Sequence, residues 1–362
     1  MKKSTNRRSF IKSSAALAAS GLILPNILTS CETKTEAPAI IGKAEKENHI
    51  IGHGDFKYKL NKDWGTQNMQ KTPVMDCHEM VQDKSGRLIL ATNHPKNNII
   101  FYDRSGKVLK TWTLGLTGTH GLTISDEGGE EFLYITSNVE HKVYKTDLNG
   151  KVILEINYPK ETGKYLEDGL WFNPTETTVA PNGNFYVADG YGHNYILEYD
   201  QKGNVVNMFG GKGDGDEHFD CCHGITLDDR DKSNPTLLIT SRSQQEFKRF
   251  TLDGKHIETI IMPGCWICRP VIKGDNLYFA VIVTKSWYVY DGCLAVLDKN
   301  NKVLSFPGAL SAPEYKEGIL QQPEYDDFSF LSPHDVCIDQ DENIFVPQWN
   351  SGRTYPLMLE RV

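Results

Sequence analysis

Residues 187–242 contain the phrase that decides the fold: VADGYGHNYILEYDQKGNVV (187–206) is followed by CCHGITL (221–227) and LLITSR (237–242). A short apolar run ends at Asp189-Gly190-Tyr191, a hairpin follows, and a new strand opens at His223. Short β-branched and aromatic runs between Gly, Asn and Asp turns are typical of an all-β protein, and helical periodicity is nearly absent elsewhere in the mature chain.

The phrase recurs along the chain with variations. The units open at His78-Glu-Met-Val, His120-Gly-Leu-Thr-Ile, Pro174-Thr-Glu-Thr-Thr-Val, His223-Gly-Ile-Thr-Leu, Arg269-Pro-Val-Ile and His334-Asp-Val-Cys-Ile. Hairpin turns occupy equivalent places at Asp103–Gly106, Asp147–Gly150, Asp200–Gly203 and Asp253-Gly254. The spacing of roughly 40 to 60 residues is the length of one four-stranded blade, so the sequence predicts a six-bladed β-propeller.

The ends of the chain are predicted to close this ring. The last unit ends near Met358-Leu-Glu-Arg-Val and lacks an outermost strand. Phe56-Lys-Tyr-Lys-Leu reads as a strand that precedes the first unit and belongs to none of the six. Pairing the two removes an exposed sheet edge, which is a hazard for open β-proteins. We therefore expect one domain over residues 51–362.

The first fifty residues have the composition of a targeting segment and a tether. Asn6-Arg7-Arg8-Ser9-Phe10 resembles a twin-arginine export motif, and an apolar stretch leads to Leu28-Thr29-Ser30-Cys31, which resembles a lipobox. Residues 1–31 are thus predicted to be a lipoprotein signal, with Cys31 lipidated, and residues 32–50 a flexible tether. The alternative is an ordinary cleaved signal with an incidental cysteine. The expected location is a bacterial membrane, in a leaflet that the sequence leaves open.

Charge and cysteine content exclude several classes of protein. The net charge of −8 and the absence of a basic stripe argue against nucleic-acid binding, and we expect a monomer. Seven cysteines remain besides Cys31, an odd number that defines no disulfide framework. For Cys265-Trp-Ile-Cys268 we expect a disulfide or two buried thiols rather than a redox or zinc motif.

Histidines open alternate units. The first positions of the six units are His78, His120, Thr175, His223, Cys268 and His334. In a propeller the innermost strands begin near the axis, so His120, His223 and His334 are expected to converge on one point. Three imidazoles with open coordination positions are typical of a catalytic Zn²⁺ site, and another divalent transition metal fits the same donors. The alternative is that each histidine caps a neighbouring carbonyl, and the role of His78 is left undecided.

These residues give the chain a resemblance to the lyase domain of peptidylglycine α-amidating enzymes, a six-bladed propeller of NHL type. The resemblance is sharpest over residues 172–242 and implies that His120, His223 and His334 bind zinc. It also implies that Tyr191 of Asp189-Gly190-Tyr191 is a base and that Arg242 binds substrate. A structural Ca²⁺ is implied at Asp335, with the backbone carbonyls of Leu122 and, more loosely, Met80.

Two positions depart from the family pattern. A substrate-orienting arginine of the first blade falls on Asn93, with His94 beside it as a candidate catalytic residue, and the cysteine after the tyrosine is Gly192. The rim of the same face is expected to carry aromatic and cationic side chains that suit a carboxylated sugar or a peptide end. These are Asn138, His193, Lys285, Trp287, Tyr288, Trp349 and Arg353.

The residues predict a metal-dependent lyase. Elimination of an oxygen substituent needs a Lewis acid for the developing charge and a base for the proton, and a nearby cation lowers the pKa of a phenol such as Tyr191. Arg242 can hold a substrate carboxylate. The favoured hypothesis is a dehydratase acting on an unsaturated uronate oligosaccharide, since the chain also resembles exported propeller dehydratases of ulvan-type degradation. The alternatives are a peptidyl-α-hydroxyglycine lyase and a non-catalytic NHL-type binding propeller; a lactonase is disfavoured because the pore is rich in imidazole rather than carboxylate.

Overall fold

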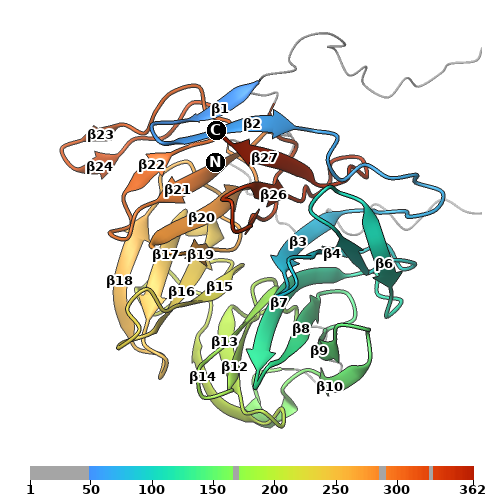
Figure 1. Cartoon of the computed structure of the whole chain (residues 1–362). Helices are drawn as coiled ribbons and strands as arrows, with labels where there is room; N and C mark the ends of the chain where they lie inside the picture. The colour runs from blue at the N-terminus through green and yellow to red at the C-terminus, as the bar shows by residue number, and fades with distance from the viewer. Residues whose placement is uncertain (1–48, 166–170, 285–290, 326–328) are drawn as a thin grey trace, which may run out of the picture. The chain divides into compact units, whose positions relative to one another are not determined.

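Each repeat of the sequence phrase folds into one antiparallel sheet, and six such sheets surround a common axis in the computed structural model (Figure 1). The structure describes residues 49–165, 171–284, 291–325 and 329–362, so the predicted signal with Cys31, and Lys285, Trp287 and Tyr288 of the rim, lie outside the described residues. Residues 47–362 form one compact unit. The predicted six-bladed propeller is confirmed.

The blades follow one another along the chain. Blade 1 consists of β3 (Cys77–Gln82), β4 (Leu88–Thr92), β5 (Ile99–Tyr102) and β6 (Val108–Trp112). Blade 2 consists of β7 (Thr119–Glu127), β8 (Glu130–Ser137), β9 (Lys142–Asp147) and β10 (Val152–Ile156). Blade 3 consists of β11 (Glu176–Val179), β12 (Phe185–Ala188), β13 (Tyr195–Tyr199) and β14 (Val205–Gly210). Blade 4 consists of β15 (Ile225–Asp228), β16 (Thr236–Ser241), β17 (Glu246–Phe250) and β18 (His256–Ile261). Blade 5 consists of β19 (Val271–Lys273), β20 (Asn276–Val281), β21 (Cys293–Leu297) and β22 (Val303–Ser305).

The sixth blade joins both ends of the described chain. Its order is β1 (Ile50–His53), β2 (Phe56–Asn61), β27 (Leu357–Arg361), β26 (Ile344–Val346) and β25 (Cys337–Ile338). The predicted outer strand β2 pairs with β27, with Leu60 opposite Leu359. The sequence did not predict β1, which adds a fifth strand and begins at Ile50, the last residue of the predicted tether.

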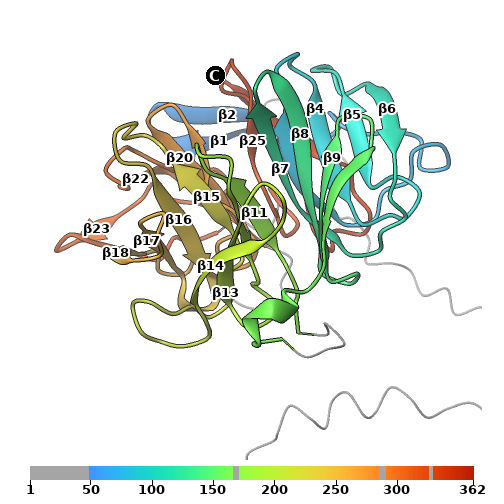
Figure 2. The same ribbon diagram turned by 90° about the horizontal axis from the view of Figure 1, so that it is seen from below.

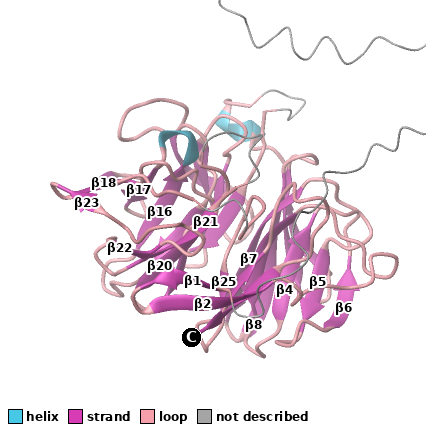
Figure 3. Cartoon of the chain, turned by 90° about the horizontal axis from the view of Figure 1, so that it is seen from above, coloured by secondary structure: helices cyan, strands magenta, loops and turns pink. Residues whose placement is uncertain are grey.

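The innermost strands bring the unit openings together. Neighbouring first strands contact one another from β25 through β3, β7, β11 and β15 to β19, and the side view places β7, β11 and β15 toward the middle (Figure 2). Outside the blades, the described residues contain only the hairpin β23 (Tyr315–Lys316)–β24 (Ile319–Leu320) and the short helices η2 (Lys160–Thr162) and η3 (Arg242–Gln244). Both helices lie on the same face of the propeller (Figure 3). None of the helices in the described ranges is long and apolar enough to cross a bilayer.

Local chemistry explains the turns. The carboxylates of Asp103, Asp147 and Asp200 each accept two backbone N–H bonds, from the residues two and four positions later. The glycine that follows in each turn has a positive φ, between 86° and 88°. This combination of an Asx turn and a left-handed glycine fixes the third-to-fourth-strand hairpins that the sequence predicted.

The seven described cysteines are all free thiols. Cys265 and Cys268 are fully buried, and burial raises the pKa of each thiol to about 12. Of the two possibilities left open for this pair, the structure therefore has buried thiols, and their high pKa makes them poor nucleophiles.

We predict that closure of the ring depends on Tyr58 of β2, whose side chain is fully buried in the core shared by blades 5 and 6. Replacement of Tyr58 by Ala removes a large buried side chain and should lower the free energy of unfolding by about 3–5 kcal/mol. Chemical denaturation measures this. The neighbouring exposed Lys57→Ala should change it by less than about 0.5 kcal/mol. Equal effects of the two substitutions would contradict the proposed closure.

Candidate metal centre and active site

Four histidines meet at the axis of the propeller. His78 lies in β3 and His120 in β7, while His223 lies two residues before β15 and His334 three residues before β25. All four are buried, and the ring centroids of the neighbouring pairs are 4.7–5.1 Å apart. The structure thus brings together the three predicted ligands and adds His78.

Irregular strand pairing sets the direction of two of these side chains. In β3 the pairing with β4 shifts between Cys77 and Glu79, and in β7 the pairing with β8 shifts between Thr119 and Leu122. A bulge of this kind redirects side chains at the start of a strand, and bulges recur beside active sites. His78 and His120 occupy the two shifted positions.

Backbone carbonyls of the next blade orient two of the rings. His120 Nδ1 donates to the carbonyl of Thr175 at 2.9 Å, and His334 Nδ1 donates to the carbonyl of His78 at 2.9 Å. Because a neutral imidazole has one N–H, the Nε2 atoms of His120 and His334 are left as acceptors. Metal-binding histidines are held by such outer hydrogen bonds. The capping of carbonyls and the binding of metal are therefore compatible rather than alternative roles.

The third ligand has two candidates. The nitrogen atoms of His78, His120 and His334 lie within 4.8 Å of one another. His223 Nε2 lies 3.2 Å from His120 Nε2, close to the separation of about 3.3 Å expected for two nitrogens on one tetrahedral Zn²⁺. The group whose nitrogens all lie this close therefore contains His78 rather than the predicted His223, and His223, close to His120, is the alternative third ligand beside His120 and His334.

The protonation of the cluster suits a divalent metal. Burial, followed by the charge of Arg242, lowers the pKa of His78 to about 3. Burial likewise holds the pKa values of His120, His223 and His334 well below the usual 6.5. Neutral imidazoles are metal ligands, and the buried Nδ1 atoms of His78 and His223 have no hydrogen-bond partner. The donor set therefore fits a transition-metal ion.

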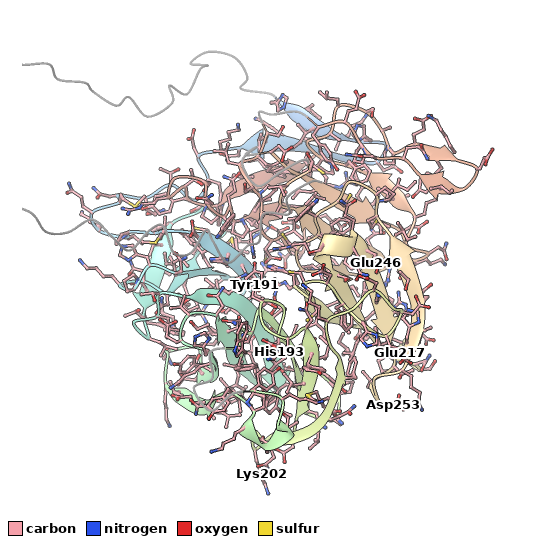
Figure 4. The ribbon with its side chains drawn as sticks, turned by 180° about the vertical axis from the view of Figure 1, so that it is seen from behind. Tyr191, His193, Lys202, Glu217, Glu246 and Asp253 are labelled. Carbon is pink, nitrogen blue, oxygen red and sulfur yellow. The ribbon has the colours of Figure 1, made fainter. Side chains whose placement is uncertain are left out.

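Tyr191 reaches this cluster from a rigid turn. The buried carboxylate of Asp189 accepts hydrogen bonds from the backbone N–H of Asn173 at 2.7 Å and of His193 at 2.6 Å, and from the hydroxyl of Tyr165 at 2.9 Å. A Cβ at Gly192 would lie 2.1 Å from the Asp189 carboxylate, so no larger residue fits where the family has cysteine. Tyr191 lies closer to the centre of the propeller face than His193 does (Figure 4).

The Tyr191 hydroxyl connects the histidines with Arg242. It lies 3.3 Å from His120 Nε2, to which it donates, and accepts a hydrogen bond of 3.3 Å from Arg242 Nη1. Tyr191 as a whole residue is 43% exposed. Desolvation of the hydroxyl raises its pKa to about 12, although Arg242 acts in the opposite direction. Without a further cation, the phenol is thus neutral at pH 7.

Arg242 is a buried cation without an acidic partner among the described residues. Its Nε donates to the carbonyl of Ile267 at 2.9 Å and its Nη2 to Cys268 Sγ at 3.3 Å, and the thiols of Cys268 and Cys221 and the hydroxyl of Tyr191 also interact with its charge. With Tyr191, Ile282 and Trp349 it lines a cavity of about 210 Å³. Burying an unpaired charge is costly, so an anion that enters this cavity is favoured.

The remaining predicted residues lie farther out. The contacts of His94 in the described structure are local, with its Nδ1 accepting from the backbone N–H of Lys96 at 3.2 Å, so it does not join the histidine cluster. The side chain of Asn93 is paired with Asp76, by bonds of 2.9 and 3.1 Å. Trp349 is the predicted rim residue that lines the cavity.

The predicted calcium ligands bind an arginine instead. Asp335 and the carbonyls of Leu122 and Met80 do converge, but each accepts hydrogen bonds from Arg269, at 2.6–3.2 Å. The guanidinium fills the place expected for Ca²⁺, so the residues present do not fit that ion. The prediction that these oxygens bind a structural Ca²⁺ is therefore wrong. Arg269 follows Cys268 at the start of its unit in the sequence, but nothing there showed where its side chain points.

Parts of this chain are similar to an NHL repeat-containing protein and to amidating lyases. NHL repeat-containing protein 3 of Mus musculus is 25% identical over 233 residues, which are 56% of this chain and 66% of that protein. A probable peptidyl-alpha-hydroxyglycine alpha-amidating lyase of Caenorhabditis elegans is 35% identical over 111 residues, 30% of each chain. The corresponding lyase 1 of Drosophila melanogaster is 32% identical over 94 residues, 25% of this chain and 16% of that one. The chain matches at most 66% of the length of these relatives, and no protein-family model matches it.

Solved structures share the fold. A catalytically inactive virginiamycin B lyase from Staphylococcus aureus, with quinupristin, superimposes with a TM-score of 0.55 at 15% identity, over 84% of this chain and 100% of that one. A gluconolactonase from Xanthomonas campestris gives a TM-score of 0.53 at 13% identity, over 84% and 89% of the two chains. At such identities the match concerns the fold alone. The predicted resemblance to NHL-type propellers and amidating lyases is confirmed by the sequence relatives.

We predict that the purified protein binds one divalent transition-metal ion per chain, as measured by elemental analysis. His120→Ala and His334→Ala should each abolish binding because both residues belong to either ligand set. His78→Ala and His223→Ala decide between the two sets. The variant that loses its metal identifies the third ligand, and the variant that keeps its metal identifies a histidine that does not bind it. His256→Ala, on the outer strand β18, is the control and should keep the metal. Metal retained by His120→Ala would contradict the assignment.

Proposed function

We propose that this protein is a metal-dependent lyase acting on a carboxylated substrate. The observation that carries the proposal is the position of the Tyr191 hydroxyl, 3.3 Å from both His120 Nε2 and Arg242 Nη1. One group that can take a proton thus lies between a cluster of metal-ligand type and an anion-binding cation. Lyases among the sequence relatives support this class of reaction.

Arg242 is proposed to hold the substrate carboxylate. Its guanidinium borders the cavity beside Tyr191 and has no acidic partner among the described residues. A carboxylate in the cavity supplies the missing counter-charge and forms charge-assisted hydrogen bonds. The interaction also places the carbon next to the carboxylate near the Tyr191 hydroxyl.

Tyr191 is proposed to be the general base. A divalent metal, when held by His120, His334 and a third histidine, would supply Lewis acidity for the developing oxygen charge and would lower the pKa of the adjacent phenol. Arg242 already lowers the pKa of Tyr191. The rigid turn at Asp189 keeps the tyrosine oxygen in place for proton transfer, which requires hydrogen-bond reach.

One substrate class is a peptidyl-α-hydroxyglycine, the substrate that the names of two relatives give. In this reaction Tyr191 takes the proton of the α-hydroxyl, the carbon–oxygen double bond forms and the carbon–nitrogen bond breaks. The nitrogen is reprotonated, which yields a peptide amide and glyoxylate. The carboxylate of the same residue would be held by Arg242.

The second substrate class is an unsaturated uronate oligosaccharide. Trp171 stacks on His193 with ring centroids 5.8 Å apart and an interplanar angle of 27°, and the tryptophan is 51% exposed. An exposed aromatic plane beside the Tyr191 turn suits the apolar face of a sugar ring. Here Tyr191 takes a proton from a saturated ring carbon, the hydroxyl group of the neighbouring carbon leaves and is protonated by Tyr191 to water, and a second carbon–carbon double bond forms.

Incubation of the metal-loaded protein with each substrate tests the proposal. Glyoxylate release identifies the peptide substrate, and a mass loss of one water identifies the uronate. Tyr191→Phe should lower turnover by about 10²-fold or more while keeping the metal, because only the proton acceptor is removed. Tyr195→Phe, from β13 of the same blade, is the control. If the Tyr191→Phe protein remains active, Tyr191 is not the base. If the metal-loaded wild type turns over neither substrate, the protein is better explained as a non-catalytic binding propeller.

We also propose that the protein is exported and anchored through a lipid on Cys31, on the basis of the lipobox-like sequence 28–31. Cell fractionation tests this. The wild type should be recovered in the membrane fraction and Cys31→Ala in the soluble exported fraction or as uncleaved precursor. Equal recovery of mature soluble protein from both would contradict lipidation.

A further inference from the structure

Directly below the histidine layer, the second residues of the units form a charged layer. These residues are Glu79, Gly121, Glu176, Gly224, Arg269 and Asp335. The three acids are almost completely buried, and Arg269 is 7% exposed. Among the second residues, Arg269 is therefore the only cation facing three carboxyl groups.

The Arg269 guanidinium contacts four other blades. Nε and Nη2 donate to the two carboxylate oxygens of Asp335 at 3.2 and 2.6 Å. Nη2 also donates to the Met80 carbonyl at 3.2 Å, and Nη1 donates to the Leu122 carbonyl at 2.7 Å. Glu79 Oε2 lies 3.2 Å and Glu176 Oε2 3.7 Å from Nη1. One side chain from blade 5 thus joins blades 6, 1, 2 and 3.

The two glycines of the layer make this arrangement possible. A Cβ at Gly224 would lie 2.6 Å from the Arg269 Cα, and a Cβ at Gly121 would lie 2.5 Å from the Thr175 carbonyl oxygen. Backbone atoms cannot move away as the end of a flexible side chain can. Only glycine at these positions lets the first strands approach closely enough for one guanidinium to span the axis.

The oxygen atoms around Arg269 are of the kind that bind calcium. Ca²⁺ takes about six to eight oxygens at about 2.3–2.6 Å, mostly from carboxylates and carbonyls. Here three carboxyl groups and two carbonyls surround the guanidinium, and the buried Glu176 Oε2 has no hydrogen-bond partner. A shorter side chain at residue 269 would leave an oxygen-lined, negatively charged hole.

We propose that Arg269 is a built-in replacement for a structural calcium ion. The guanidinium supplies the positive charge that holds five blades together, so the wild-type fold needs no calcium. Removal of the guanidinium converts the same oxygens into a calcium site. This inference is independent of the proposed lyase activity.

Thermal unfolding with 5 mM EGTA or 5 mM CaCl₂, concentrations of roughly the order that saturates sites with Kd up to about 10⁻³ M, tests the proposal. The wild-type Tm should be the same in both, and dialysed protein should contain no stoichiometric calcium. Arg269→Ala should lower the Tm in EGTA by about 5–15 °C, because buried acids lose their partner. Calcium should restore several degrees of this loss by binding only the folded variant.

Three variants make the result specific. Arg269→Lys keeps a cation and should not respond to calcium, whereas Arg269→Ala combined with Asp335→Asn should lose the calcium response. Arg104→Ala, which breaks the ion pairs to the buried Asp339 and the exposed Asp341, should not acquire one. A calcium-dependent Tm or bound calcium in the wild type would overturn the proposal, even if Arg269→Ala does not fold. A folded Arg269→Ala protein that ignores calcium would overturn it as well.

Discussion

The convergence of six first strands on one axis is the constraint on which the structure depends. Whatever residues open these strands are buried together, because neighbouring first strands are in contact. Apolar side chains could fill such a pore, but this chain places four imidazoles in one layer and four ionisable side chains in the next. Burial of so many polar groups is costly unless each layer satisfies its own members.

The two layers solve this problem differently. The histidines remain neutral, since burial lowers their pKa values, and two of them donate to carbonyls of the following blade. In the charged layer one guanidinium contacts Asp335, Glu79 and two carbonyls, and Glu176 Oε2 lies 3.7 Å from it without a hydrogen bond. The first layer therefore keeps imidazole nitrogens that could bind a metal ion, whereas the second already contains a cation of its own.

Much of this was predictable from the repeats. Alignment of the unit openings places His120, His223 and His334 at equivalent positions, and the ends of the second strands place Tyr191 and Arg242 on the same face. The six blades and the closing strand follow from the same pattern. The resemblance even identified the oxygens of Asp335, Leu122 and Met80 as ligands of one cation.

What the repeats could not show was the direction of individual side chains. His78 and His223 have the same position in their units. In space, His78 is marked by the bulge in β3 and by its grouping with His120 and His334, and His223 by its short Nε2 separation from His120. The prediction that the cation at the axis is Ca²⁺ was wrong for a related reason. Arg269 comes from a blade with no acid or histidine at its opening, and its reach across the axis depends on the absence of a Cβ at Gly121 and Gly224.

The adjacency of the two layers connects stability with chemistry. His78 precedes Glu79 and His334 precedes Asp335, so the contacts that Arg269 forms with these two acids fix the backbone of two candidate metal ligands. The His78 carbonyl in turn holds the His334 ring. A loosely held cation at the second layer would let these backbones shift, and small displacements at a reacting centre are costly to catalysis. A covalently attached guanidinium cannot dissociate, which gives the histidine layer a permanent support.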